Sequence, residues 1–434
     1  SKAEQEWKKQ IIHLAGGVGT QNTTFRNYLK GYEQIIEDTS FGGKVHTFSK
    51  NTSAPIQITV FDSIANLIND GVSMITFFGH ASGGGFDQNI DNPDSYSNKD
   101  GKYPLLIANS CLVGDIHMTS NSSNSEIWTL NERGVIGFLA TVALGEQGAL
   151  NNYTKELYVK IGQTMYGESI GKCIKSAIFD IKAQAINKNV CLQMTLHGDP
   201  SVVINTRPKP DYTITLSDVY TNPPNISAEL DSFDLNMIVT NIGKAINNDL
   251  TLQVKRLYPP EANIQDSIYY LSFPATHYKD TLTLRLPVDI INGVGLNKFD
   301  IQIDAFPQQV DELNEDNNDV LHTVWIKTDD IMPVYPYEYA VIDSPVTPLK
   351  ASTGDPFAPI ETYTFEIDTN NHFNPPMLST TITHAGGLVV WDPADRKITR
   401  LNSIHVVISY SVFCLIQTLP SPPCPPSSSS LHPL

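Results

Sequence analysis

Two apolar segments of the chain each lead into a reactive side chain. Residues 72–79 precede His80, and residues 104–110 precede Cys111. Short apolar runs that end at turn residues are typical of buried strands in a parallel sheet, whose carboxyl ends hold ligands and catalytic groups. Neighbouring strands lie about 4.8 Å apart. We therefore expect the imidazole and the thiol to approach each other, as a histidine base and a cysteine nucleophile require.

Each residue also has a simpler interpretation. A lone cysteine that closes an apolar strand is most often an inert, buried thiol, and a histidine in the same place is most often a turn residue. The presence of both at strand ends, beside small and flexible residues, favours the catalytic interpretation. The glycine-rich segment 16–19 lacks both the Gly-Lys-Ser/Thr of a phosphate loop and the spacing of a dinucleotide fingerprint, which argues against nucleotide binding.

A wider pattern surrounds these two residues. It comprises the stretches Phe78–Ser82, Ile107–Asp115, Gly134–Ala140 and His197–Ser201. Together they resemble the gingipain family of cysteine peptidases, which belongs to the caspase-type clan. The resemblance spans residues 1–206 and implies an α/β caspase-like domain in which Cys111 is the nucleophile and His80 the general acid/base.

The resemblance also implies an oxyanion hole, built from the backbone N–H of Cys111 and that of the residue after the histidine. The family usually has glycine at the second position, whereas this chain has Ala81, which would be strained at a positive φ. The family further has an upstream acidic residue that orients the imidazole, but the matching stretch Gly19–Thr24 contains no carboxylate. We therefore expect a dyad of His80 and Cys111 rather than a triad.

The chemistry that this dyad implies needs no cofactor. A free thiol has a pKa of about 8.5, and a neighbouring imidazolium lowers it, so that thiolate is present at neutral pH. The thiolate attacks a peptide carbonyl, backbone donors stabilise the oxyanion, and the histidine protonates the leaving amine. Water then hydrolyses the thioester, or a second amine intercepts it. The sequence does not distinguish a hydrolase from a transpeptidase.

The loop between the dyad residues, 82–94, is rich in glycine and acidic residues. Asp87 or Asp91 could offer a carboxylate to a basic substrate side chain, although a flexible surface loop is the favoured interpretation. A calcium site at Asp91 and Asp94 is conceivable, but the ligand spacing is not diagnostic. The sequence does not show whether Arg, Lys or a neutral residue is accepted at P1, because we expect the specificity pocket to draw on residues outside it.

Composition limits the classes of partner. The chain has 434 residues, a formal net charge of −17 and no cluster of Lys and Arg, which excludes a typical nucleic-acid partner. Only 17% of the residues are charged, a balance that suits an extracellular, β-rich protein. The five cysteines do not form a disulfide framework, and we expect Cys173 and Cys191 to be ordinary thiols.

The length predicts about three domains. Residues 1–206 alternate strands and helices, which predicts a mostly parallel sheet with helices on both faces. The expected strands are 11–15, 44–49, 72–79, 104–110, 134–141 and 201–205, and the expected helices are 24–37, 58–70, 125–132, 148–165 and 169–187. The charged lead into the first strand suggests that this domain is N-terminally truncated.

Residues 211–327 show the period-two pattern of an antiparallel sandwich after a proline-rich linker. The stretches Val239–Ala245 and Val310–Asn318 resemble CARDB, an Ig-like module of bacterial adhesion proteins, which usually serves as a spacer or adhesive domain. The acidic segment Asp311–Asp319 could bind a structural calcium ion, although a solvated hairpin tip is the favoured interpretation.

The remaining sequence divides at residue 395. Residues 333–395 read as the start of a further β-sandwich module. Residues 396–434 contain an apolar run, Ser403–Leu419, and then a stretch rich in proline and serine that cannot build a core. The run is at the short limit for a bilayer span. We expect a disordered or artefactual tail and no transmembrane segment.

The sequence therefore predicts a secreted or surface-bound bacterial cysteine endopeptidase with protein or peptide substrates. A close alternative is a sortase-type transpeptidase of the type IX secretion system, with cell-surface or secretion-system partners. An alternative of another class is an inactive surface-adhesion protein that keeps the peptidase-like domain as a scaffold. Ala81 and the missing acid favour the inactive scaffold, whereas intact His80 and Cys111 count against it.

Overall fold

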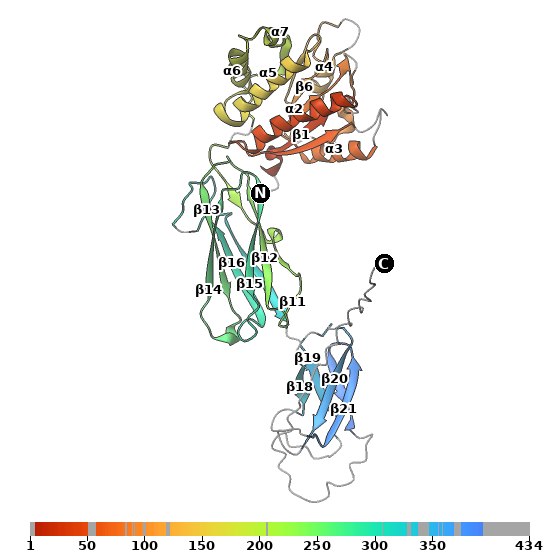
Figure 1. Ribbon diagram of the computed structural model, residues 1–434, viewed down its shortest axis with the longest axis vertical. Coiled ribbons are helices and arrows are strands. Elements are labelled where there is room, and N and C mark those ends of the chain that lie inside the picture. Colours follow the sequence, from red (N-terminus) through yellow and green to blue (C-terminus); the bar gives the residue numbers. More distant parts are fainter. Residues whose placement is uncertain are drawn as a thin grey trace, which may run out of the picture.

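The chain folds into an α/β domain followed by two β modules (Figure 1). The computed structural model describes residues 5–50, 58–82, 85–88, 90, 92–98, 101–118, 122–204, 207–305, 307–327, 331–336, 347–354, 356–357, 359–368 and 375–393. The segment 394–434 lies outside these residues, so the predicted tail is untested.

The N-terminal domain is built on a six-stranded sheet with the order β2-β1-β3-β6-β7-β8. The strands are β1 (Gln10–Ala15), β2 (Lys44–Ser49), β3 (Met74–Phe78), β6 (Leu105–Asn109), β7 (Gly137–Thr141) and β8 (Met194–Gly198). All neighbouring pairs are parallel except β7 and β8. This confirms the predicted, mostly parallel sheet.

Helices cover both faces of this sheet, as expected. They are α2 (Thr20–Glu37), α3 (Ile58–Asp70), α4 (Asn124–Thr129), α5 (Gln147–Val159), α6 (Ile170–Ile181) and α7 (Ala185–Gln193). Successive strand residues point to opposite faces. Ile11 therefore packs in the core with α2, α5, α6 and α7, and Ile12 in the core with α3 and α4. Both cores hold the strand ends in fixed positions.

The C-terminal part of this domain departs from the expected pattern. The predicted strand 201–205 is wrong, because Met194–Gly198 forms the antiparallel edge strand and Val203 makes only an isolated bridge with Ser169. Pro200, which has no N–H to donate, follows β8 closely. The predicted helix 169–187 is two helices, α6 and α7, and α5 continues into a π-helical turn, Lys160–Thr164.

The second module is a sandwich of two sheets. Its strands are β9 (Tyr212–Thr213), β10 (Val219–Asn222), β11 (Ile226–Ser227), β12 (Ser232–Asn241), β13 (Asp249–Leu257), β14 (Ser267–Pro274), β15 (Lys279–Pro287), β16 (Gly295–Ile303) and β17 (Asp319–Lys327). One sheet has the order β10-β12-β15, with β9 paired to β12, and the other has the order β11-β17-β16-β13-β14. Leu235 and Val239 of the first sheet share one buried core with Val254 and Ile301 of the second.

The third module has two small sheets. Strands β18 (Ile331–Tyr335), β19 (Leu349–Thr353) and β22 (Leu388–Trp391) form one, and β20 (Glu361–Ile367) and β21 (Leu378–His384) form the other. Leu349, Val389 and Trp391 from the first pack with Tyr363 and Phe365 from the second. The two sheets therefore share a core of their own.

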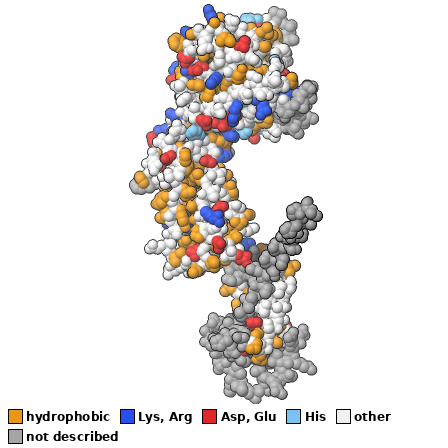
Figure 2. Space-filling view, viewed as in Figure 1, with side chains coloured by type: hydrophobic (Ala, Val, Ile, Leu, Met, Phe, Trp, Pro, Cys, Tyr) orange, Lys and Arg blue, Asp and Glu red, His pale blue; other side chains and the backbone are white. Residues whose placement is uncertain are grey.

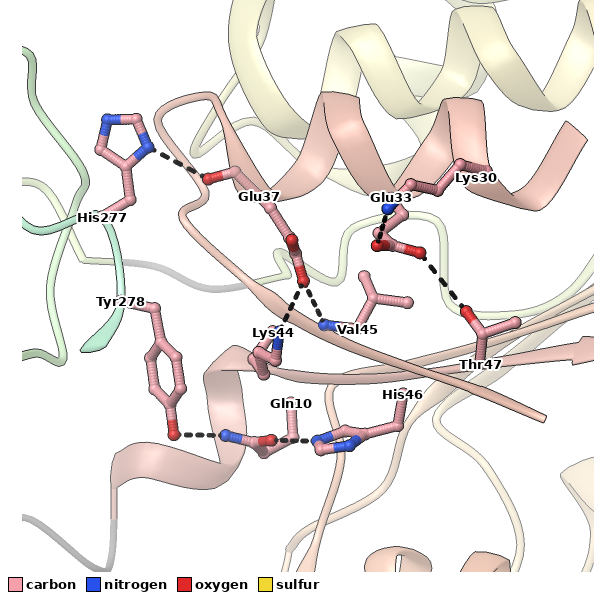
Figure 3. A network of polar contacts seen from close by, with 10 residues as sticks. All are labelled: Gln10, Lys30, Glu33, Glu37, Lys44, Val45, His46, Thr47, His277 and Tyr278. Atoms are coloured by element: carbon pink, nitrogen blue, oxygen red, sulfur yellow. Dashed lines mark hydrogen bonds and ion pairs between the residues drawn. The ribbon is translucent and has the colours of Figure 1, made fainter. Parts of the chain in front are cut away.

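The sandwich docks at the amino-terminal edge of the α/β sheet (Figure 3). Tyr278 Oη accepts from Gln10 Nε2 at 2.6 Å and donates to Glu6 at 2.5 Å, and His277 Nδ1 lies 3.2 Å from the carbonyl of Glu37. Gln10 is the first residue of β1. The two domains form a continuous surface here (Figure 2).

Candidate active site

His80 and Cys111 follow adjacent strands at the carboxyl edge of the sheet. Strands β3 and β6 pair in parallel from Met74 with Leu105 to Phe78 with Asn109. The pairing extends one step further, because Gly79 N donates to the carbonyl of Asn109 at 3.2 Å. The His80 side chain is exposed and that of Cys111 is half-buried. The two predicted residues therefore lie at the same edge, within two residues of paired positions.

The backbone after Cys111 is held in an unusual turn. Leu112 has φ +62°, a left-handed conformation that costs a non-glycine residue about 1–2 kcal/mol. Leu112 N donates to the carbonyl of Ala143 at 3.1 Å, and Gly114 N to that of Thr141 at 3.0 Å. Cys111 Sγ lies 4.0 Å from the carbonyl of Gly145. The loop between β7 and α5 therefore lies beside the thiol and fixes its turn.

The imidazole of His80 contacts the first two turns of α2. Its Nε2 lies 3.1 Å from Gln21 Oε1, and its ring makes an edge contact with Phe25, with centroids 5.8 Å apart. Gln21 falls in the stretch Gly19–Thr24, in which the sequence offers no acid. The side chain beside the imidazole is therefore a neutral amide and not a carboxylate. The sequence alone does not reveal this contact.

Ala81 begins a short hairpin of β4 (Ala81–Ser82) and β5 (Gly85–Phe86). Asp87 N donates to the carbonyl of His80 at 2.9 Å. Because hydrogen-bonded and non-hydrogen-bonded pairs alternate along antiparallel strands, the Ala81 N–H points away from β5. Among the described residues, Ala81 is not one of those with positive φ, so alanine brings no strain there. Its role as an oxyanion donor stays a prediction, as does that of the Cys111 N–H.

Asp87 is directed inward, toward the end of β1. Its Oδ2 accepts from Gly17 N at 2.6 Å, and Gln88 Nε2 donates to the carbonyl of Ala15 at 2.7 Å. A Cβ on Gly79 would lie 2.8 Å from Asp87 Oδ1. The carboxylate thus ties the hairpin to the β1–α2 loop, and its substrate-binding role stays a prediction. Asp91 lies outside the described residues.

The predicted calcium sites also remain untested. Asp94 Oδ1 accepts from Asn131 Nδ2 at 2.9 Å. In the acidic segment of the sandwich, Glu312 accepts from Tyr212 N and from Asn318 Nδ2. Within the described part of the chain, no group of three or more His, Cys, Asp or Glu side chains is arranged to hold a metal ion.

The other described thiols and the second histidine of the motif lie in different surroundings. Cys173 and Cys191 are free, and burial raises the pKa of Cys173 to about 11 and that of Cys191 above its usual value. His197 belongs to β8, where its Nε2 lies 3.0 Å from Thr195 Oγ1 and burial lowers its pKa. Cys111 is the thiol among these three that follows a strand at the catalytic edge.

Residues 1–205 match the model of peptidase family C25. The N-terminal domain is therefore similar to this family over its whole length. This match supports a cysteine peptidase that acts on protein substrates. The family match ends just before the linker, so it covers the α/β domain and neither of the β modules.

Solved structures add more distant likenesses. Arg-specific gingipain R is 14% identical, with 75% of this chain and 68% of that chain covered and a TM-score of 0.39. The complex of the Porphyromonas gingivalis RgpB pro- and mature domains is also 14% identical, with 75% and 70% covered and the same TM-score of 0.39. A CARDB domain from Pyrococcus furiosus, in complex with di-metal ions, is 17% identical, with 30% and 98% covered and a TM-score of 0.21. No curated protein matches the chain.

Proposed function

We propose that the α/β domain is a cysteine endopeptidase in which Cys111 is the nucleophile and His80 the general acid/base. The observation that carries the proposal is the position of the two residues, immediately after the paired strands β3 and β6. Strands in a sheet are about 4.8 Å apart, so side chains at these ends can reach one another. The hydrogen bond from Leu112 N to Ala143 holds the backbone next to Cys111, and the contact with Gln21 holds the His80 ring. Both observations support a thiol and an imidazole that are already positioned for the reaction.

The reaction follows from the chemistry of these groups. His80 takes the proton of the Cys111 thiol, and the thiolate attacks the peptide carbonyl. The backbone N–H groups of Cys111 and Ala81 stabilise the oxyanion that forms. His80 then donates its proton to the leaving amine, which departs and leaves a thioester. Water, deprotonated by His80, attacks the thioester and releases the acid and the free thiol.

The arrangement of domains suits a secreted enzyme with large substrates. The sandwich contacts the amino-terminal edge of the sheet through Tyr278 and His277, whereas His80 and Cys111 lie at the carboxyl edge. We infer that the β modules act as spacers and that the enzyme works outside the cell or at its surface. No helix in the described ranges is long and apolar enough to span a bilayer.

The test is cleavage of a defined peptide library by the full chain, with products identified by mass spectrometry. His80→Ala should lower kcat/KM by about 10²–10⁴-fold, the usual contribution of a general acid/base. Cys111→Ala removes the nucleophile and should lower it by at least as much. Cys191→Ala, the matched control, should leave it unchanged. An added amine that appears in the products would identify a transpeptidase. Full activity of Cys111→Ala, or no cleavage by the folded wild type, would refute the proposal.

A further inference from the structure

A neutral side chain, Gln21, lies beside His80. We propose that Gln21 is a positioning residue that orients the imidazole of His80 and selects its tautomer, without supplying a negative charge. The inference rests on the proposed function of the dyad. Its starting point is the 3.1 Å separation of Gln21 Oε1 and His80 Nε2.

The backbone that carries Gln21 is fixed at the end of β1. Asn22, the next residue, donates from Nδ2 to the carbonyls of Gly16 at 2.9 Å and Ala15 at 3.3 Å. Its Oδ1 accepts from Ser49 Oγ of β2 at 2.9 Å. The first turn of α2 is therefore anchored to two strands, and the position of the Gln21 amide follows from the sheet itself.

A second side chain of the same helix restrains the ring. Phe25 lies four residues after Gln21, so both occupy one face of α2. Phe25 is buried, makes the edge contact with His80 and packs on Phe78 with ring centroids 5.0 Å apart. The hydrogen bond and the ring contact together restrict both the plane of the imidazole and its rotation.

The hydrogen bond decides which nitrogen of His80 carries the proton. An amide oxygen can only accept, so the Gln21 contact places the proton of the neutral imidazole on Nε2. Nδ1 is then the nitrogen that can take the thiol proton from Cys111. An amide in this position orients the base as a carboxylate would, but it does not stabilise the imidazolium by charge.

The other ionisable groups on the surrounding elements do not replace that charge. Among the described residues these groups include the Cys111 thiol after β6, the Asp87 carboxylate after β5 and the Arg26 guanidinium of α2. Further along α2, the Tyr28 phenol packs on Phe78 and Lys30 pairs with Glu33. The carboxylate of Asp87 accepts from Gly17 N, and Arg26 lines a hollow with Thr23, Lys30 and Thr47 on another part of α2 and β2. A carboxylate introduced at position 21 should therefore change the proton affinity of the pair.

The experiment compares pH profiles of kcat/KM for three variants of the full chain, with the peptide that the wild type cleaves best. Gln21→Ala should lower kcat about tenfold with KM unchanged, because it removes one hydrogen bond to the reacting base. Gln21→Glu should retain kcat and move the basic limb of the profile up by about one pH unit, because an adjacent carboxylate stabilises the imidazolium. Asn27→Ala, an exposed amide on another face of α2, is the matched control and should match the wild type.

The outcomes separate this inference from the proposed function. Thermal unfolding should show that all three variants fold, since Ala and Glu are both good residues for a first helical turn. If the wild type depends on His80 but Gln21→Ala keeps its kcat within twofold and Gln21→Glu keeps the wild-type profile, Gln21 has no positioning role. If the wild type cleaves no peptide, or cleavage does not depend on His80, the proposed function and this inference are both wrong.

Discussion

A methyl group at Gly16 should disrupt the active-site edge, because the Asp87 carboxylate occupies that space. A Cβ on Gly16 would lie 2.9 Å from Asp87 Cγ and 2.9 Å from Oδ2, whereas optimal carbon contacts are about 3.5–4.0 Å. The overlap must displace the carboxylate and break its bond to Gly17 N. Overpacking costs about 1–3 kcal/mol and a hydrogen bond to a charged acceptor about 1.5–3 kcal/mol. We expect Gly16→Ala to lower the stability of the α/β domain by about 3 kcal/mol.

A double-mutant cycle isolates this clash. Asp87→Ala alone should cost about 2 kcal/mol through the lost hydrogen bond. With the carboxylate gone, the methyl group at Gly16 has room, so Gly16→Ala/Asp87→Ala should be about as stable as Asp87→Ala. Urea-dependent hydrogen exchange of peptides from residues 5–50 and 58–82 reports the free energy of unfolding of this domain separately from the sandwich. Additive losses in the double variant would refute the packing argument.

Three further predictions concern the turn, the sandwich and the interface. Leu112→Val should lower kcat/KM more than Leu112→Gly, because a β-branched residue is strained at φ +62°; equal rates would contradict this. Burial raises the pKa of Glu312 to about 8. Between about pH 5 and 8, the folded sandwich therefore keeps a proton on Glu312 that the unfolded chain has lost. Its stability should fall as the pH rises from about 5 to 8 and change little above that, and it should fall less in Glu312→Gln, as measured by urea unfolding followed by hydrogen exchange. Tyr278→Phe removes both hydrogen bonds of the hydroxyl at the interface between the two domains. It should make the 207–210 linker easier to cleave by limited proteolysis and leave kcat/KM unchanged. A large loss of activity would show that the interface affects the site.

Much of the α/β domain is predictable because its elements are strongly periodic. The limits of β2 and α3 agree with the sequence prediction to the residue. The antiparallel edge strand β8 does not agree with the sequence prediction. The β-branched residues Val202, Val203 and Ile204 have the stronger strand pattern, whereas Met194–Gly198 forms the strand by pairing with β7. In the sandwich, the period-two pattern predicts the type of fold, whereas the pairing of β14 with β13 and of β17 with β16 is seen only in the structure.

The candidate site likewise has residues that the sequence predicts and residues that only the structure reveals. His80 and Cys111 are predictable, because each is adjacent to an apolar strand and parallel strands bring their ends together. Gln21 is not predictable, because a glutamine in a helical turn has no pattern that separates it from other surface amides. The inward direction of Asp87 is equally hidden in the sequence, since it depends on the absence of a Cβ at Gly16 and Gly79. Contacts of this kind require the fold.

The most direct test of the account is competitive labelling of the three described cysteines in the full chain with a panel of peptidyl chloromethyl ketones at neutral pH, with sites located by mass spectrometry. Burial raises the pKa of Cys173 and that of Cys191, so both thiols should react slowly. The account predicts that Cys111 is modified at least about tenfold faster than either, and that His80→Ala removes this advantage. Equal labelling of Cys111 and Cys191 in the folded wild type, or labelling of Cys111 that does not depend on His80, would contradict it.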